Sequence, residues 1–256
     1  MEITITGSGT SQGVPVIGCD CEVCKSSNPK DNRLRSSIHI YYKNQSIVID
    51  TGPDFRQQMI NNNISTLDAI LFTHEHKDHV AGLDDVRPFN FIQKKPIEIY
   101  CNNQVFTALK REFHYIFDPK FQYPGIPKIN RNEISKEKFL INKKIEIEPI
   151  EVLHHKLPVL GYRIDNFAYI RDAKTIDENE KNKLKNLDLL VLNALRLMKH
   201  LSHFNLEEAI ELIQELQPKK AVLTHISHFM GLHSEIEKTL PENISLGYDN
   251  QKIILN

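Results

Sequence analysis

The chain has 256 residues, and its 32 Lys and Arg residues nearly balance its 33 Asp and Glu residues. Hydrophobic residues make up 40% of the chain, and no run approaches the ~18 apolar residues of a membrane span. This composition excludes membrane-spanning, disordered and collagen-like classes. The near-zero charge also makes nucleic acid an improbable main partner, because proteins that bind its phosphates carry a basic excess.

The N-terminal residues 2–7 alternate between apolar and polar side chains, as in a strand. They lack the basic start and the long apolar core of a signal peptide. We therefore expect a cytoplasmic protein with no membrane partner. Because no repeat, linker or low-complexity tract divides the sequence, we expect a single domain over residues 1–256.

The first half of the chain shows strand patterns that alternate with helical ones. The apolar run at 69–73 is the clearest strand, and it leads directly into a histidine-rich loop. Strands are predicted at about 2–7, 37–42, 46–50 and 69–73, and helices at about 79–92 and 103–116.

The second half begins with a strand-rich stretch over 145–171, which is typical of a meander. Asn205 is a good N-cap for a helix because Glu208 follows three residues later, and Pro218 ends that helix. Mixed strands and helices of this kind predict an α/β (α+β) fold in which helices cover the sheets. The other elements predicted here are strands at about 188–192, 221–223, 244–247 and 251–255 and a helix at about 230–239.

Three of the four cysteines, Cys19, Cys21 and Cys24, lie within six residues of one another. This spacing is too tight for a disulfide framework in a cytosolic chain of this length, so metal binding is the better interpretation. The fourth, Cys101, stands alone, and we interpret it as a small buried hydrophobic residue.

Ten of the twelve histidines fall in four groups, and the densest group directly follows the apolar run. His74 and His76 are two apart in extended chain, so they project the same way and can share one metal ion. The next turn directs Asp78 and His79 towards a second ion. Neutral imidazoles and carboxylates suit divalent ions, and a catalytic ion keeps one position open for water. The alternative is a solvated polar loop.

This His-x-His-x-Asp-His pattern resembles the motif of the metallo-β-lactamase superfamily. The resemblance implies a four-layer αββα sandwich with two divalent metal ions in the active site. It also implies further metal ligands after later strands. The first of these is a histidine after a mid-chain strand, for which His154 is the candidate and His155 the alternative. The implied ligands are His74, His76 and His154 for one ion, Asp78, His79 and His225 for the other, and Asp172 as a bridge between them.

The N-terminal glycine-rich segment 7–15 and the cysteines resemble the phosphoribosyl cyclic phosphate phosphodiesterase branch of that superfamily. In this branch three cysteines and a histidine bind a structural zinc ion. The resemblance therefore implies that the zinc ligands are Cys19, Cys21, Cys24 and His228, a closed set suited to structural zinc. Segments 156–162 and 202–206 also resemble branch signatures.

The same resemblance gives catalytic roles to two residues. Asp78 is expected to be both a metal ligand and a proton acceptor. His203 is expected to support the phosphate or to protonate the leaving oxygen, and His200 is the alternative residue for this role. The branch usually has a small hydroxyl residue where this chain has Arg171, and strand alternation predicts that this side chain points away from the site. Asp50 is expected to orient a ligand histidine without binding metal itself.

The resemblance predicts a metal-dependent phosphodiesterase that hydrolyses small cyclic ribose phosphodiesters with two zinc or manganese ions. One alternative is an RNA-processing hydrolase like ribonuclease Z, which clamps tRNA with an extended arm. Only segment 118–144, with six lysines and one arginine, is a candidate for such an arm, and its acidic residues dilute the charge. The other alternative is a non-catalytic zinc-scaffolded interaction protein, which would be expected to have lost ligands. The sequence is also compatible with a homodimer.

Overall fold

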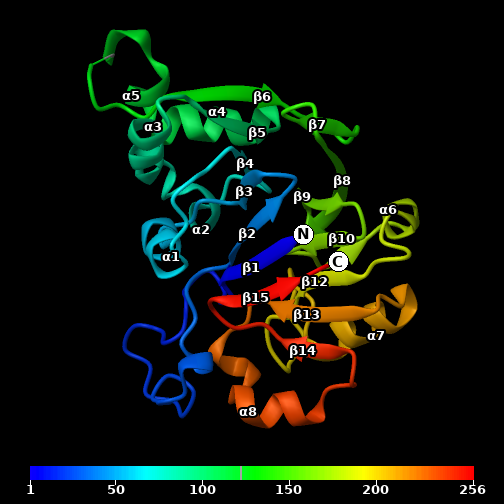
Figure 1. Ribbon diagram of the computed structural model, residues 1–256. Coiled ribbons are helices and arrows are strands. Elements are labelled where there is room, and N and C mark those ends of the chain that lie inside the picture. Colours follow the sequence, from blue (N-terminus) through cyan, green and yellow to red (C-terminus); the bar gives the residue numbers. More distant parts are fainter. Residues whose placement is uncertain (122) are drawn as a thin grey trace. The chain divides into compact units, whose positions relative to one another are not determined.

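The computed structural model describes residues 1–121 and 123–256, and these residues form two compact units, each built around one β-sheet (Figure 1). The expected single domain over residues 1–256 stays a prediction. Unit 1 comprises Met1–Thr6, Ser37–Ser135 and Lys252–Asn256, and unit 2 comprises Gly7–Ser36 and Lys136–Gln251.

Unit 1 has a seven-stranded sheet in the order β15-β1-β2-β3-β4-β5-β6. Strands β3 to β6 are parallel to one another, whereas β2 pairs with β3 in antiparallel register. The central strands carry almost only buried side chains, as expected for parallel strands covered on both faces. The strands are β1 (Glu2–Gly7), β2 (Ser37–Tyr42), β3 (Gln45–Ile49), β4 (Ala69–Leu71), β5 (Ile97–Cys101), β6 (Ile129–Glu133) and β15 (Gln251–Ile254).

The helices of unit 1 pack their apolar faces against this sheet, and Phe55, Val105 and Leu109 are among the residues in that core. One 3₁₀ helix, η2, separates two short α-helices. The helices are α1 (Phe55–Asn61), α2 (Lys77–Val80), η2 (Leu83–Val86), α3 (Arg87–Gln93), α4 (Asn103–Glu112), α5 (His114–Phe117) and η3 (Pro119–Phe121).

Two helices predicted in unit 1 are each broken in the structure. The helix predicted at 79–92 stops near Gly82, whose backbone N–H donates to the Thr51 carbonyl at 2.8 Å. A Cβ atom at Gly82 would lie 2.2 Å from the Gly52 carbonyl oxygen, so this close approach requires glycine. The helix predicted at 103–116 ends at Glu112, because Phe113 leaves helical geometry with φ −120° and ψ 44°.

Unit 2 has an eight-stranded sheet in the order β11-β8-β9-β10-β12-β13-β14, and β7 pairs with β8 beside this path. The meander predicted at 145–171 is confirmed, because β8, β9 and β10 are successive antiparallel strands. From β10 onward the strands run parallel. The strands are β7 (Phe139–Ile141), β8 (Ile145–His154), β9 (Leu157–Ile164), β10 (Phe167–Ile170), β11 (Thr175–Ile176), β12 (Leu189–Asn193), β13 (Lys220–Thr224) and β14 (Ile244–Leu246).

The main helix of unit 2, α7 (Leu206–Leu216), begins as the sequence predicts. The Asn205 side chain accepts from the Glu208 backbone N–H, and the Glu208 carboxylate accepts from the Asn205 N–H, which completes a capping box. The helix predicted at 230–239 is instead three short turns. These turns and the remaining helices are η1 (Pro29–Asp31), α6 (Glu178–Asn182), η4 (His228–Met230), α8 (His233–Ile236) and η5 (Glu237–Thr239).

Among the described residues, no helix is both long and apolar enough to cross a bilayer. The cytoplasmic location expected from the sequence stays a prediction.

Candidate metal sites

The His-x-His-x-Asp-His motif of unit 1 follows the carboxyl end of β4. His74 and His79 are buried and their ring centroids lie 3.8 Å apart. His74 Nε2 lies 2.9 Å from His76 Nδ1, so the first two histidines do face the same side, as their spacing predicts. Asp78 completes the cluster, with Oδ2 3.1 Å from His79 Nε2.

Asp50 stands behind this cluster at the end of the neighbouring strand, β3. Its Oδ2 atom lies 2.8 Å from His79 Nδ1, so the predicted contact with a motif histidine is confirmed. Thr73 donates its backbone N–H and its hydroxyl to the same carboxylate at 2.9 and 2.8 Å. His74 Nδ1 lies 3.1 Å from the Thr73 hydroxyl. With Nδ1–H donating in both rings, each Nε2 atom keeps a lone pair for a cation.

Gly52 allows the loop after β3 to pack directly against the backbone of the histidine motif. A Cβ atom there would lie 2.3 Å from the Asp78 carbonyl oxygen, so the backbone of the motif and that of the loop can meet only at glycine. Asp50, two residues earlier, has a left-handed backbone with φ 65°. This loop therefore fixes the carboxylate behind the motif.

Unit 2 holds a second cluster where β10 and β13 end. Asp172 and His225 are buried and both have left-handed backbones, with φ 55° and 58°. Asp172 Oδ1 lies 3.2 Å from His225 Nδ1 and 3.8 Å from His203 Nδ1. One ligand atom from each of these three residues lies within 4.8 Å of the others, which is close enough to share an ion.

His154 lies beside this cluster at the end of β8, and its ring centroid is 4.5 Å from that of His203. Its Nδ1–H donates to the Ser202 carbonyl at 3.0 Å, which orients the ring. His155 is exposed in the following turn. The structure therefore brings His154, and not its rival, towards the other candidate ligands of unit 2.

His203 is largely buried, and burial, followed by the neighbouring charge of His225, lowers its pKa to about 2. His200 stacks on His203, with ring centroids 5.2 Å apart and an interplanar angle of 28°. In this environment His203 is a neutral imidazole with one N–H donor.

The orientation predicted for Arg171 is wrong. Its side chain is fully buried, and Nη1 donates to the Ser36 carbonyl at 2.7 Å while Nη2 lies 3.2 Å from His225 Nδ1. Strand alternation does not apply, because β10 ends at Ile170 and Arg171 already belongs to the following loop. The guanidinium group therefore lies against a candidate metal ligand.

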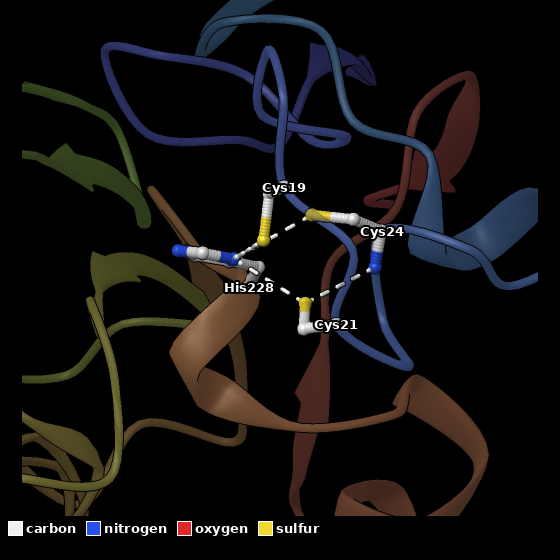
Figure 2. Close-up of side chains that lie close together, drawn as sticks. All are labelled: Cys19, Cys21, Cys24 and His228. Atoms are coloured by element: carbon white, nitrogen blue, oxygen red, sulfur yellow. Dashed lines mark hydrogen bonds between the residues drawn. The ribbon is translucent and has the colours of Figure 1, made fainter.

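The four residues Cys19, Cys21, Cys24 and His228 form a third cluster, and it lies entirely within unit 2. Figure 2 shows their side chains converging from two segments far apart in the sequence. The three sulfur atoms lie 3.2, 3.4 and 3.5 Å from His228 Nδ1, in chain order. A tetrahedral zinc site with bonds of about 2.0–2.3 Å separates its ligands by roughly 3.5–3.8 Å, so this donor set fits zinc.

The protonation tendencies of these thiols differ. The backbone N–H of Cys24, which lies 3.4 Å from the Cys21 sulfur, lowers the pKa of Cys21 to about 6. Burial raises the pKa of Cys24 to about 11. A bound cation favours the thiolate form of such ligands, so metal binding by this cluster releases protons.

The sequence did not indicate two residues that shape these clusters. Thr73 links His74 to Asp50, and the Ser202 carbonyl orients His154. Thr73 directly precedes the motif, so its position in the sequence could have predicted a contact with the motif histidines. The Ser202 contact spans 48 residues of chain, and no local pattern reveals it.

Residues 45–226 match the family model described as a beta-lactamase superfamily domain. A crystal structure titled as a new diphosphatase from the PhnP family superposes with a TM-score of 0.92 and 36% sequence identity, covering all of this chain and 98% of that one.

Two curated relatives span more than this chain. The octanoyltransferase of Porphyromonas gingivalis is 39% identical over all of this chain, which covers 52% of that protein. A ribonuclease Z of Prochlorococcus marinus is 31% identical over 63% of this chain and 49% of its own length. The chain thus spans about half the length of these relatives.

Proposed function

Because the chain belongs to the metallo-β-lactamase superfamily and to the PhnP family within it, we propose that it is a metal-dependent phosphodiesterase. Its substrates are small phosphodiesters, with cyclic ribose phosphodiesters as the preferred class. The intact motif cluster, with Asp50 behind His79, carries this proposal, because a chain that had lost catalysis would be free to lose these ligands.

The proposed metal complement is two active-site ions, zinc or manganese, and one structural zinc ion. Ions of this kind supply a water of lowered pKa and offset negative charge on phosphoryl oxygens. The donor chemistry of each cluster supports this complement, because imidazoles and carboxylates suit both active-site metals and thiolates favour zinc. The proposed active-site ligands are His74, His76, Asp78, His79, His154, Asp172 and His225, and the proposed structural ligands are Cys19, Cys21, Cys24 and His228.

Two residues of the chain would act on the substrate directly. Asp78 is partly exposed and would accept a proton while it binds metal. His203 lies beside Asp172 and would support a phosphate oxygen or protonate the leaving oxygen. We expect His203→Ala to lower kcat about 10²–10⁴-fold while the metal content is retained. The exposed His114, changed to Ala, is the matched control.

Phosphoric anhydrides are the second candidate substrate class, because the PhnP-family structure of 36% identity is titled a diphosphatase. An RNA precursor is less suited to this chain. Segment 118–144 is the candidate for a tRNA-clamping arm, but parts of it form the short strands β6 and β7, which pair with other strands. Residue 122 of this segment lies outside the described residues. A purely scaffolding role is disfavoured by the complete set of candidate ligands.

A hydrolysis screen of protein reconstituted with zinc or manganese tests the proposal. The substrates are a cyclic ribose phosphate, a linear phosphodiester, a nucleoside diphosphate, a thioester and a tRNA precursor. The highest kcat/KM is expected for a phosphodiester. A thioester cleaved ~10²-fold more efficiently than every phosphodiester would overturn the proposal, since that ratio is about 2.7 kcal/mol of transition-state preference.

A further inference from the structure

Asp249, which follows β14 in unit 2, joins two segments that are far from it in the sequence. Its Oδ1 atom accepts hydrogen bonds from the backbone N–H and the hydroxyl of Ser8, both at 2.8 Å. Its Oδ2 atom accepts the backbone N–H of Leu34 at 2.6 Å. The Arg33 guanidinium group also donates to the Ser8 hydroxyl, at 2.9 Å. The carboxylate therefore holds the backbone at Ser8 and the backbone at Leu34 together.

Ser8 is bound directly to the segment that carries His225. The Ile226 N–H donates to the Ser8 carbonyl, and the Thr10 N–H donates to the Ile226 carbonyl, both at 3.0 Å. The Thr10 hydroxyl lies 3.4 Å from His225 Nε2. Because Ile226 directly follows His225, the backbone position of Ser8 constrains that of the histidine.

Leu34 leads to the same histidine along a second path. The Gly9 N–H donates to the Leu34 carbonyl at 2.8 Å, and the Ser36 N–H donates to the Gly9 carbonyl at 2.9 Å, so these two segments pair with each other. The Ser36 carbonyl accepts from Arg171 Nη1 at 2.7 Å, and Arg171 Nη2 lies 3.2 Å from His225 Nδ1. Both ring nitrogens of His225 therefore face groups held by segments that Asp249 fixes.

We propose that Asp249 is a positioning residue for the active-site metal ions, because it holds His225 beside Asp172 through these two paths. This inference rests on the proposed function, which makes His225 and Asp172 metal ligands. The two residues have ligand atoms close enough to share an ion, with His225 Nδ1 3.2 Å from Asp172 Oδ1. Asp249 is not itself one of the proposed ligands, so it acts only through the backbone that it anchors.

Manganese binding tests the inference, because manganese prefers carboxylates to thiolates and so reports on the active-site ligands and not on the cysteines. Protein that holds only its structural zinc is titrated with Mn²⁺, and the free ion is measured by electron paramagnetic resonance. Removing a group that orients a metal ligand weakens metal affinity about 10–100-fold. Since Asp249 acts through intervening residues, Asp249→Asn should weaken manganese affinity about tenfold and leave the zinc content unchanged. Ser8→Ala, which removes one of the three hydrogen bonds to this carboxylate, should weaken it about threefold.

Asp31→Asn is the matched control. Asp31 is buried in the same N-terminal segment, but it accepts from the Ser26 hydroxyl and the His233 backbone N–H, at 2.6 and 2.7 Å, outside both paths. This variant should lower Tm and keep the manganese affinity of the wild type.

Wild-type manganese affinity in both Asp249→Asn and Ser8→Ala would overturn the inference, as would an equal loss of affinity in Asp31→Asn, because the carboxylate would then serve only general stability. If Asp249→Asn does not fold, the affinity of Ser8→Ala decides. A wild-type chain that binds manganese but hydrolyses no phosphodiester contradicts the proposed function, whereas a loss of manganese affinity confined to Asp249→Asn and Ser8→Ala still supports the role of Asp249.

Discussion

Asp50→Asn is the substitution that most directly separates orientation of the motif from metal binding. Asp50 accepts three hydrogen bonds at 2.8–2.9 Å, two from Thr73 and one from His79. Asparagine has nearly the same shape and tolerates the left-handed backbone at φ 65°, so the loop is expected to keep its fold. The change removes one acceptor and puts two N–H donors in its place.

The amide oxygen can serve either the Thr73 backbone N–H or the pair formed by the Thr73 hydroxyl and His79, but not both. If it stays with the backbone N–H, the amide nitrogen faces His79 Nδ1, and that ring must then carry its proton on Nε2. A hydrogen bond to a charged acceptor contributes ~1.5–3 kcal/mol, so the free energy of unfolding should fall by about 2 kcal/mol. The Nε2 lone pair that a metal needs is lost in that tautomer, and loss of such an orienting partner typically weakens metal affinity about 10–100-fold.

Competition with a chromophoric chelator measures this affinity, and urea unfolding of the metal-free protein measures the stability. Asp68→Asn is the matched control, because Asp68 accepts from the Ser46 backbone N–H at 2.9 Å before β4 begins, away from the motif. A loss of stability with unchanged metal affinity in Asp50→Asn would refute the argument that Asp50 sets the His79 tautomer.

Three further substitutions test other parts of the molecule. Cys21→Ser should remove one zinc ion per chain and lower Tm, because metal binding is coupled to folding; retained zinc in elemental analysis would show that the cluster is wrongly assigned. Asn205→Ala should lower the free energy of unfolding in urea by about 1 kcal/mol through loss of the capping box, and an unchanged midpoint would contradict this. Burial lowers the pKa of His39 to about 4, so the unfolded chain binds more protons between pH 4 and 6.5 and stability falls as the pH is lowered through that range. His39→Gln should remove about 2 kcal/mol of the stability difference between pH 7 and pH 5, and an unchanged pH slope in denaturant titrations would show that His39 is not the group involved.

Local sequence patterns were sufficient to predict the family, the α/β fold class and the residues of the motif cluster. The superfamily, the phosphodiesterase branch and the αββα fold class predicted from the motifs are confirmed by the family and structural matches. The motif cluster and the capping box at Asn205 depend on residues a few positions apart, so a single segment reveals them.

Features that depend on distant segments were not predictable in this way. The break near Gly82 depends on the carbonyl of Gly52, and the buried position of Arg171 depends on the Ser36 carbonyl, 135 residues away in the sequence. Strand β6 was not predicted, because its residues, Ile-Asn-Arg-Asn-Glu, are mostly polar and do not alternate between apolar and polar side chains. The helix α1 also carries no side-chain cap to mark its start.

Metal stoichiometry measured together with activity tests the central claim of a metal-dependent phosphodiesterase most directly. Metal-free protein is loaded with zinc or manganese, and hydrolysis of a cyclic ribose phosphodiester is followed against ions bound per chain. The proposed ligands predict that the structural zinc ion alone gives no turnover and that activity rises as two further ions bind. Asp172→Ala should keep the structural zinc and lose this rise. Full activity in Asp172→Ala, or in protein that holds only the structural zinc, would contradict the claim.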